Sequence, residues 1–489
     1  MSAGVMQTYE YRPKFHFSPP TNWMNDPNGL VYFKGEYHLF YQHYPKENHW
    51  GPMHWGHAVS RDLVTWEHLP IALAPDEQGM IFSGSAVVDW NDTTGFFNGG
   101  TGLVAIFTYH DHPHESASRE KQSLAYSKDC GRTWIKYEGN PVLTSDKHAD
   151  FRDPKVFWHQ ETKQWVMIVA SGQSVCLYRS LNLKEWSFSS EFGQGIGSHD
   201  GVWECPDLFA LPLDGDTAAL TWVMLVSVGN NPAIGEGSRT QYFTGHFDGY
   251  SFTPDQASRK IRWIDYGRDN YAGVSWSDVP SEDGRRIYIG WMSNWKYAGE
   301  TPTKGWRGAM TIPRELTLES RNGEIVLIQR PVKELDGIRI PLIESGGNSF
   351  AELKSICSAI ELETYEILAE FKLTETIDSL GFKIRASEKE KTLVGYSVKD
   401  ETVFIDRTSS GAVDFHDGFP GRHQAKLKSD NKYVKFHLVV DRSSVEIFMN
   451  DGLVAMTDLI YPSSCSRGLS FFCDGGEVLP YKIKINNLG

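Results

Sequence analysis

The stretch SRDLVTWEHLP, residues 60–70, decides the fold, because segments of the same design recur along the chain. They are SKDCGRTWIKYEGNP at residues 127–141, RSLNLKEWSFSSEFG at 179–193 and GHFDGYSFTPD at 245–255. Each is a turn rich in Asp, Asn, Ser or Gly that leads into a short strand containing Trp or Phe. A unit repeated in this way indicates a repeat architecture.

Each closing turn follows an apolar strand, and each unit opens with a strand that carries a polar or acidic residue. The opening strands begin near Asp26, Phe82, Asp153, Glu204 and Asn270, so the period is uneven, roughly fifty to seventy residues. The strands are short, and helical periodicity is nearly absent from this region. Five openings predict five blades of a β-propeller, each with four strands and variable loops.

The repeat stops after residue 320, and residues 329–349 have the character of a connection. From about Ala351 the pattern changes to regularly spaced alternating strands such as FHLVVDRSSVEIFMND, which is typical of a two-sheet β-sandwich. We therefore predict an all-β protein with a five-bladed β-propeller over residues 1–335, a linker over 336–350 and a C-terminal β-sandwich over 351–489. A chain of 489 residues also favours two domains.

The charge and the aromatic content of the chain indicate which classes of partner it can bind. Lys and Arg number 48 against 62 Asp and Glu, a net charge of −14, which disfavours nucleic acid and anionic membrane surfaces. The 16 Trp residues suit β cores and can also stack on sugar rings. A neutral polar ligand fits this composition better than a polyanion.

The six cysteines form no CxxC pair or regular framework, which predicts free thiols and a reducing compartment. The first 17 residues lack the apolar core of a signal peptide, and no apolar run reaches membrane-spanning length. We expect a cytoplasmic protein; the alternative is a secreted protein whose leader has been removed. The sequence leaves monomer and homodimer open.

Three opening segments carry an acid directly before a proline or one residue away from it. They are NWMNDPNG at residues 22–29, FRDPKV at 151–156 and VWECPDLF at 202–209. Proline restricts its own backbone and that of its predecessor, which holds the acid still. One such dipeptide is ordinarily only a turn. Three at equivalent blade openings predict carboxylates that converge at the central axis, because the first strand of each blade lines it.

Converging carboxylates suit glycoside cleavage by double displacement, which needs one ionised and one protonated acid. Crowding three acids in one pocket should also raise the pKa of the most buried one, because like charges disfavour ionisation. That acid could then protonate a leaving oxygen. These residues alone leave open which acid takes which role.

The motifs WMNDPNG, FSGSA, FRDPKVFW and WECPDL, in this order, resemble those of glycoside hydrolase family 32, whose members include invertases, levanases and exo-inulinases. The resemblance covers nearly the whole chain and is greatest to bacterial levanase-like exo-fructosidases. It implies a five-bladed propeller followed by a β-sandwich. It also implies a retaining β-fructofuranosidase that removes terminal fructosyl units from sucrose or from fructans such as levan and inulin, through a covalent fructosyl-enzyme.

The resemblance assigns Asp26 as nucleophile, Glu204 as acid/base and Asp153 as the residue that stabilises the transition state. It also implies a pocket for the terminal fructose, lined by Asn25, Gln42, Trp50, Phe82, Ser83, Arg152 and Trp295. No cofactor and no metal are expected, since the His-rich segment HDHPHES at residues 110–116 matches no standard zinc spacing. The expected partner is a neutral sugar.

Two other functions use the same residues differently. A fructosyltransferase would pass the same fructosyl group to another sugar hydroxyl, so its catalytic acids are identical. A non-catalytic fructan-binding protein would have lost an acid, but Asp26 and Glu204 are both present.

Overall fold

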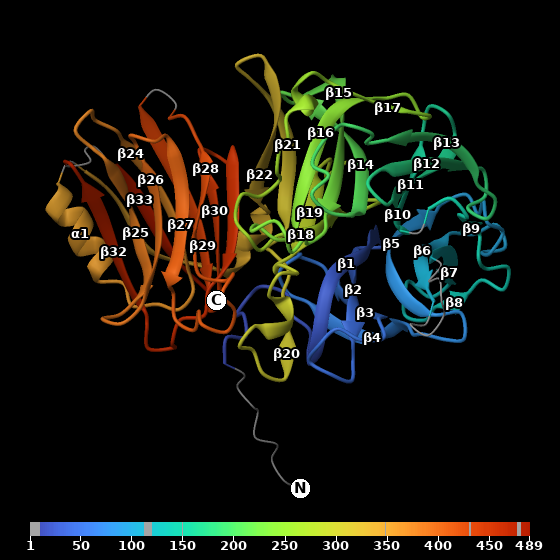
Figure 1. Ribbon diagram of the computed structural model, residues 1–489, viewed down its shortest axis with the longest axis horizontal. Helices are drawn as coiled ribbons and strands as arrows, with labels where there is room; N and C mark the ends of the chain where they lie inside the picture. Colours follow the sequence, from blue (N-terminus) through green and yellow to red (C-terminus); the bar gives the residue numbers. More distant parts are fainter. Residues whose placement is uncertain (1–9, 112–119, 149, 348, 430–431, 477–480) are drawn as a thin grey trace, which may run out of the picture.

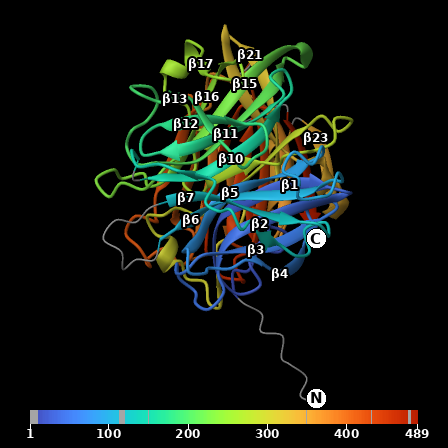
Figure 2. The same cartoon turned by 90° about the vertical axis from the view of Figure 1, so that its right-hand side faces the viewer.

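The computed structural model describes residues 10–111, 120–148, 150–347, 349–429, 432–476 and 481–489. Two β-rich bodies lie side by side, and β21 and β22 of the first body lie nearest the second (Figure 1). The view turned by 90° places β1, β5 and β10 next to one another (Figure 2). Among the residues described, no helix is long and apolar enough to cross a membrane.

Consecutive strands pair antiparallel in the first body. The first sheet contains β1 (Asn22–Phe33), β2 (Glu36–Tyr44), β3 (His54–Ser60) and β4 (Glu67–Leu73), with β20 (Trp306–Arg307) parallel to the start of β1. The second contains β5 (Met80–Asp89), β6 (Gly102–His110), β7 (Glu120–Ser127), β8 (Ile135–Lys136) and β9 (Leu143–Thr144). The third contains β10 (Phe151–His159), β11 (Gln164–Ser171), β12 (Val175–Ser180) and β13 (Ser187–Phe192).

The remaining strands of this body form two further sets that a single pair, Leu213 with Leu318, joins into one sheet. The fourth set contains β14 (Trp203–Leu213), β15 (Asp216–Val228), β16 (Arg239–Phe247) and β17 (Phe252–Pro254). The fifth contains β18 (Tyr271–Ser275), β19 (Arg286–Trp291), β21 (Arg314–Arg321) and β22 (Glu324–Pro331). Short 3-10 helices lie at η1 (Ala257–Arg259), between β17 and β18, and at η2 (Ala298–Glu300), between β19 and β20, and η3 (Lys333–Ile338) follows β22 and leads to the second body. These sets agree with the predicted propeller.

The repeated closing turns share one local structure. In three of them a Ser hydroxyl donates to the Asp or Asn two residues later: Ser60 to Asp62 at 3.0 Å, Ser127 to Asp129 at 2.8 Å and Ser180 to Asn182 at 3.2 Å. The residue after that acceptor has a positive φ of 58–63° in each turn. The same Asp or Asn side chain also accepts from a backbone amide further along each turn, at 2.9–3.0 Å. Side-chain-to-backbone hydrogen bonds of this kind reverse the chain within few residues, so the repeated sequence determines a repeated bend.

The second body consists of two sheets. One has the order β23 (Arg339–Gly347), β33 (Tyr481–Leu488), β24 (Tyr365–Lys372), β29 (Tyr433–Asp441), β30 (Ser444–Met449) and β31 (Val454–Leu459). The other has the order β28 (Arg422–Lys426), β27 (Thr402–Ser409), β26 (Lys391–Ser397), β25 (Ser379–Ala386) and β32 (Gly468–Asp474). Apolar residues of both sheets form one buried core. The predicted β-sandwich is confirmed.

The segment 336–350, predicted as a linker, is mostly strand. β23 pairs with β33 over nearly its whole length and so belongs to the sandwich. Its side chains are largely exposed, which is why its sequence resembles a connection. The helix α1 (Phe350–Ser358) follows, where a strand region was predicted to begin. The Ser349 side chain accepts from the Glu352 amide and caps this helix.

Buried ion pairs join the two bodies. Arg314 donates to Asp265 at 3.0 Å and also contacts Glu446 of the sandwich at 2.5 Å, and the three side chains are almost fully buried. His16 bridges Asp441 and Glu446 at 2.7 and 2.8 Å. Burial lowers the pKa of His16, but the hydrogen bonds to both carboxylates outweigh it and raise the pKa to about 9. Three carboxylates, of Asp265, Asp441 and Glu446, thus share two cations, Arg314 and His16, across the interface.

We expect Arg314→Met to destabilise the protein by about 3–5 kcal/mol, because it leaves the buried Asp265 without its cation and leaves Glu446 with His16 alone. Thermal or urea unfolding of the variant and the wild type measures the difference. Arg330→Met is the matched control: its ion pair with Glu319 is 43% exposed on the arginine side, so its loss should cost about 1 kcal/mol or less. Equal stability of the two variants would show that the buried cluster does not stabilise the interface.

Candidate active site

The first strand of each strand set carries a β-bulge close to its start, where it pairs with the second strand. The bulges lie between Met24 and Pro27, Phe82 and Gly84, Arg152 and Lys155, Glu204 and Asp207, and Tyr271 and Val274. A bulge interrupts the alternation of side chains and redirects one residue. The candidate acids Asp26, Asp153 and Glu204 all lie in or beside these interruptions.

Three of the bulges hold a non-glycine residue in the left-handed region, with φ of 64° at Asp153, 44° at Cys205 and 53° at Ala272. Hydrogen bonds fix each one: the Asp153 amide donates to Thr108 Oγ1 at 3.0 Å, and the Cys205 amide to Asp153 Oδ2 at 3.0 Å. The Ala272 amide donates to Ser227 Oγ at 3.1 Å. Backbone strain of this kind concentrates at functional sites.

The bulges open into a cavity of about 300 Å³. All ten residues predicted to form the site line it: Asn25, Asp26, Gln42, Trp50, Phe82, Ser83, Arg152, Asp153, Glu204 and Trp295. They come from β1, β2, β5, β10, β14 and two loops, so residues far apart in sequence meet at one end of the first body.

Asp26 lies on β1 with both carboxylate oxygens bonded. Oδ1 accepts from Asn25 Nδ2 at 2.9 Å, and Oδ2 accepts from Ser83 Oγ at 2.7 Å. Burial raises the pKa of Asp26, the Asn25 and Ser83 hydrogen bonds lower it, and the charge of Glu204 raises it further, so the net shift is upward. These donors hold the carboxylate in one orientation.

Asp153 lies on β10, and only 6% of the residue is exposed. Its Oδ2 and the Oδ2 of Asp26 lie 3.6 and 3.5 Å from the same sulfur, Cys205 Sγ, so the two carboxylates face each other across one thiol. Burial raises the pKa of Asp153 to about 8; Arg152 opposes this shift, and Glu204 and Asp26 add to it. Burial and the same carboxylates raise the pKa of the Cys205 thiol well above its usual value, so the thiol stays protonated.

Glu204, on β14, is the most strongly paired of the three acids. Arg152 Nη2 donates to Glu204 Oε1 at 2.9 Å, and the Tyr271 hydroxyl donates to Glu204 Oε2. Burial and Glu204 raise the pKa of Tyr271 well above its usual value, so it remains a donor. Burial lowers the pKa of Arg152, but Glu204 and Glu120 raise it well above the usual value, so the guanidinium stays charged.

Aromatic rings form the walls of the cavity. Trp295 stacks on Trp23 with ring centroids 5.9 Å apart. Phe82 stacks on His110 at 4.2 Å and meets Trp50 edge-on at 6.2 Å. Trp50 is 42% exposed and stands at the rim. A polar floor with apolar walls suits a sugar ring, which presents hydroxyls at its edge and C–H groups on its faces.

Comparison with known proteins decides the family. The models for the glycosyl hydrolases family 32 N-terminal domain and for the family 32 C terminal match residues 16–331 and 341–487. The chain belongs to glycoside hydrolase family 32. The levanase of Bacillus subtilis is 51% identical to this family 32 chain over 483 residues, which cover 98% of this chain and 70% of that protein.

Solved structures agree with the fold of the family 32 hydrolase. The exo-inulinase from Aspergillus awamori is similar with a TM-score of 0.90 at 35% identity, and 98% of each chain is covered. The beta-fructofuranosidase from Schwanniomyces occidentalis complexed with fructosyl-erythritol has a TM-score of 0.86 at 31% identity, again with 98% of each chain covered.

Several residues that contact the predicted site of this family 32 hydrolase were not predicted. His110, Glu120 and Asp150 also line the cavity, and Tyr271 binds Glu204 from the fifth strand set. His110 belongs to the segment HDHPHES, of which residues 112–116 lie outside the described residues. Tyr271 follows Asn270, where the fifth opening strand was placed, and a search of that strand for donors could have found it.

Proposed function

We propose that this protein is a retaining, exo-acting β-fructofuranosidase that releases terminal β-D-fructofuranosyl units from sucrose and from fructans. The arrangement of Asp26, Asp153 and Glu204 around one cavity carries this proposal. A volume of about 300 Å³ is at the small end of the range for ligand pockets, so it suits a single terminal sugar unit. Relatives named levanase and exo-inulinase support fructans as substrates.

In the proposed first step a carboxylate oxygen of Asp26 attacks the anomeric carbon C2 of the fructosyl unit. The bond from C2 to the glycosidic oxygen breaks, and Glu204 gives its proton to that leaving oxygen. Water then attacks C2 of the fructosyl ester while Glu204 takes a proton back, which releases fructose and restores Asp26. The carboxylate of Asp153 stabilises the positive charge that develops in both transition states.

The position of the Glu204 side chain in the cavity supports its role as the acid/base. Its side chain is 23% exposed, whereas Asp153 is almost fully buried. The leaving group departs toward the open side of the cavity, so the acid that serves it must reach that side. Arg152 and Tyr271 hold Glu204 there from both of its oxygens.

The raised pKa of Asp153 places a proton on that buried acid in the free enzyme. Sugar hydroxyls that donate to Asp153 favour its ionised form. Substrate binding would thus move the proton from Asp153 to Glu204, the next acid of the trio, and prepare both residues for the first step.

We expect kcat/KM to fall as the pH rises through about 8, the raised pKa of Asp153, because the shared proton is then lost. Because the pKa of Asp153 is raised, its carboxyl group keeps the proton below this pH and loses it above this pH. The pH profile of sucrose hydrolysis measures this limb. In Asp153→Asn the alkaline limb should move to lower pH, because asparagine cannot hold the proton; an unmoved limb would contradict the transfer.

Trapping with methanol tests whether the reaction retains the configuration at C2. A fructosyl-enzyme that partitions between water and methanol should yield methyl β-D-fructofuranoside, because two inversions at C2 restore the β configuration. Methyl α-D-fructofuranoside, identified by carbon NMR, would overturn the proposed double displacement.

The products formed from concentrated sucrose distinguish hydrolysis from fructosyl transfer. Mainly new oligosaccharides with little free fructose would favour a fructosyltransferase.

A further inference from the structure

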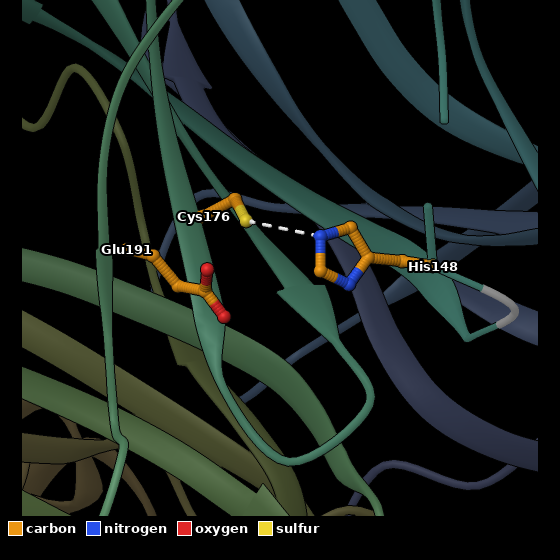
Figure 3. Close-up of side chains that lie close together, drawn as sticks. All are labelled: His148, Cys176 and Glu191. Atoms are coloured by element: carbon orange, nitrogen blue, oxygen red, sulfur yellow. Dashed lines mark hydrogen bonds between the residues drawn. The ribbon is translucent and has the colours of Figure 1, made fainter. Parts of the chain in front are cut away.

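Outside the catalytic cavity, three side chains with nitrogen, sulfur and oxygen donors meet on the third strand set. His148 precedes β10, Cys176 lies on β12 and Glu191 lies on β13. One donor atom from each lies within 4.8 Å of the other two, and Cys176 Sγ lies 4.0 Å from His148 Nε2. The three side chains point toward a common space (Figure 3).

We propose that His148, Cys176 and Glu191 form a binding site for a zinc-class divalent cation. Thiolate, imidazole and carboxylate are the three ligand types that zinc prefers, and a tetrahedral site with three protein ligands leaves the fourth position to water. In such a site the ligand atoms lie about 3.3–3.8 Å apart. The sulfur and nitrogen lie 4.0 Å apart, and all three donor atoms lie within 4.8 Å of one another, so side-chain rotations that shorten these distances by up to about 1 Å would complete the geometry.

The scaffold of the site is rigid. Cys176 and Glu191 are direct partners in the β12–β13 ladder, so their side chains leave the same face of the sheet. Ser174 Oγ donates to Glu191 Oε1 at 2.6 Å and orients the carboxylate, as outer-shell groups do for metal ligands. The His148 amide donates to Ser145 Oγ at 3.2 Å, which anchors the turn that carries the imidazole.

Charge also favours a divalent cation. Binding of the cation releases the Cys176 proton to solvent, so that a thiolate and a carboxylate supply two negative charges and a neutral imidazole adds none. One opposing cation is Lys147, whose Nζ lies 3.8 Å from Glu191 Oε2 and whose side chain is 78% exposed. Because lysine is this exposed, a bound ion can displace it without burying its charge. Cys176 is only 1% exposed, which protects the sulfur from bulk solvent.

The ligand spacing explains why the sequence predicts no metal. The intervals from residue 148 to 176 and from 176 to 191 match no standard zinc motif. Pairing of β12 with β13, together with the turn before β10, creates the site. A bound ion would tie the segment that carries His148 and Asp150 to the β12–β13 hairpin. The proposed cation site differs from the expectation, drawn from the sequence, that the protein holds no metal.

Titration of the tag-free, chelator-treated protein with Zn²⁺ and Co²⁺ tests the site. We expect one tightly bound equivalent of Zn²⁺ by calorimetry and a thiolate-to-cobalt charge-transfer band in the near ultraviolet with Co²⁺. Cys176→Ser should abolish the band and weaken Zn²⁺ binding by about 100-fold or more. Cys465→Ser, which removes an exposed thiol elsewhere, should leave both unchanged.

Glu191→Gln provides a second variant that keeps the size of the side chain. It should weaken Zn²⁺ binding by about tenfold or more and leave kcat/KM on sucrose unchanged, because Glu191 lies outside the catalytic cavity. Absence of a tightly bound equivalent in the wild type would overturn the proposal. Wild-type affinity and an intact cobalt band in Cys176→Ser would overturn it as well.

Discussion

We expect replacement of Asp26 with alanine to lower kcat on sucrose and levan by a factor on the order of 10⁴–10⁶, because the proposed fructosyl ester would have no carboxylate on which to form. KM should change much less, because the aromatic walls and the remaining polar groups still bind the sugar. Steady-state kinetics with both substrates measures the effect, and circular dichroism shows whether the variant is folded.

Asp150→Asn is the matched control for this loss. Asp150 also lines the cavity and pairs with Arg152 at 2.7 Å, but its side chain is 43% exposed. We expect a decrease in kcat/KM of less than about tenfold, in keeping with the small free energy of exposed ion pairs. Comparable losses in both variants would mean that general electrostatics, rather than a nucleophile at position 26, accounts for the rate.

Replacing Glu204 with glutamine lowers kcat/KM on sucrose by about 10²–10⁴-fold, the usual contribution of general acid–base catalysis. Glutamine keeps the size of the side chain: its amide oxygen can still accept from Arg152, and its amide nitrogen can donate to the Tyr271 hydroxyl oxygen, so the loss reports on the proton. Kinetics on sucrose and on an activated aryl β-D-fructofuranoside, whose leaving group needs no proton, separates the two half-reactions.

The aryl substrate should form the fructosyl-enzyme rapidly in Glu204→Gln, so that breakdown of the ester becomes slow. Added azide, which needs no general base, should then accelerate turnover and yield β-fructofuranosyl azide. Equal losses on sucrose and on the aryl substrate, without acceleration by azide, would assign the acid/base role to another residue.

Much of the fold could be predicted because its signals are local. The Ser-to-Asp hydrogen bonds in the closing turns join residues two positions apart, so each turn can be predicted from a few consecutive residues. The convergence of the acids could be predicted because each of the three motifs places an acid next to a proline or one residue away from it in an opening strand, in or beside a bulge. None of the six cysteines forms a disulfide, as the irregular cysteine spacing predicted.

The errors and omissions fall where the structure depends on distant contacts. β23 is mostly exposed and contains Pro341, and only its pairing with β33 makes it a strand. The omission of α1 is the exception, because this helix has a local signal: Ser349 and Glu352 have the spacing of a capping box. The interface ion pairs and the contact between Tyr271 and Glu204 depend on how remote strands pack, which single motifs do not encode.

A crystal structure of the Glu204→Gln variant with intact sucrose tests the central claim most directly. We predict that the fructosyl ring fills the cavity, with C2 about 3–3.5 Å from a carboxylate oxygen of Asp26 and sugar hydroxyls bonded to Asp153. The glycosidic oxygen should face the side chain of residue 204. A fructosyl unit bound outside this cavity, or one whose C2 points away from Asp26, would contradict the account.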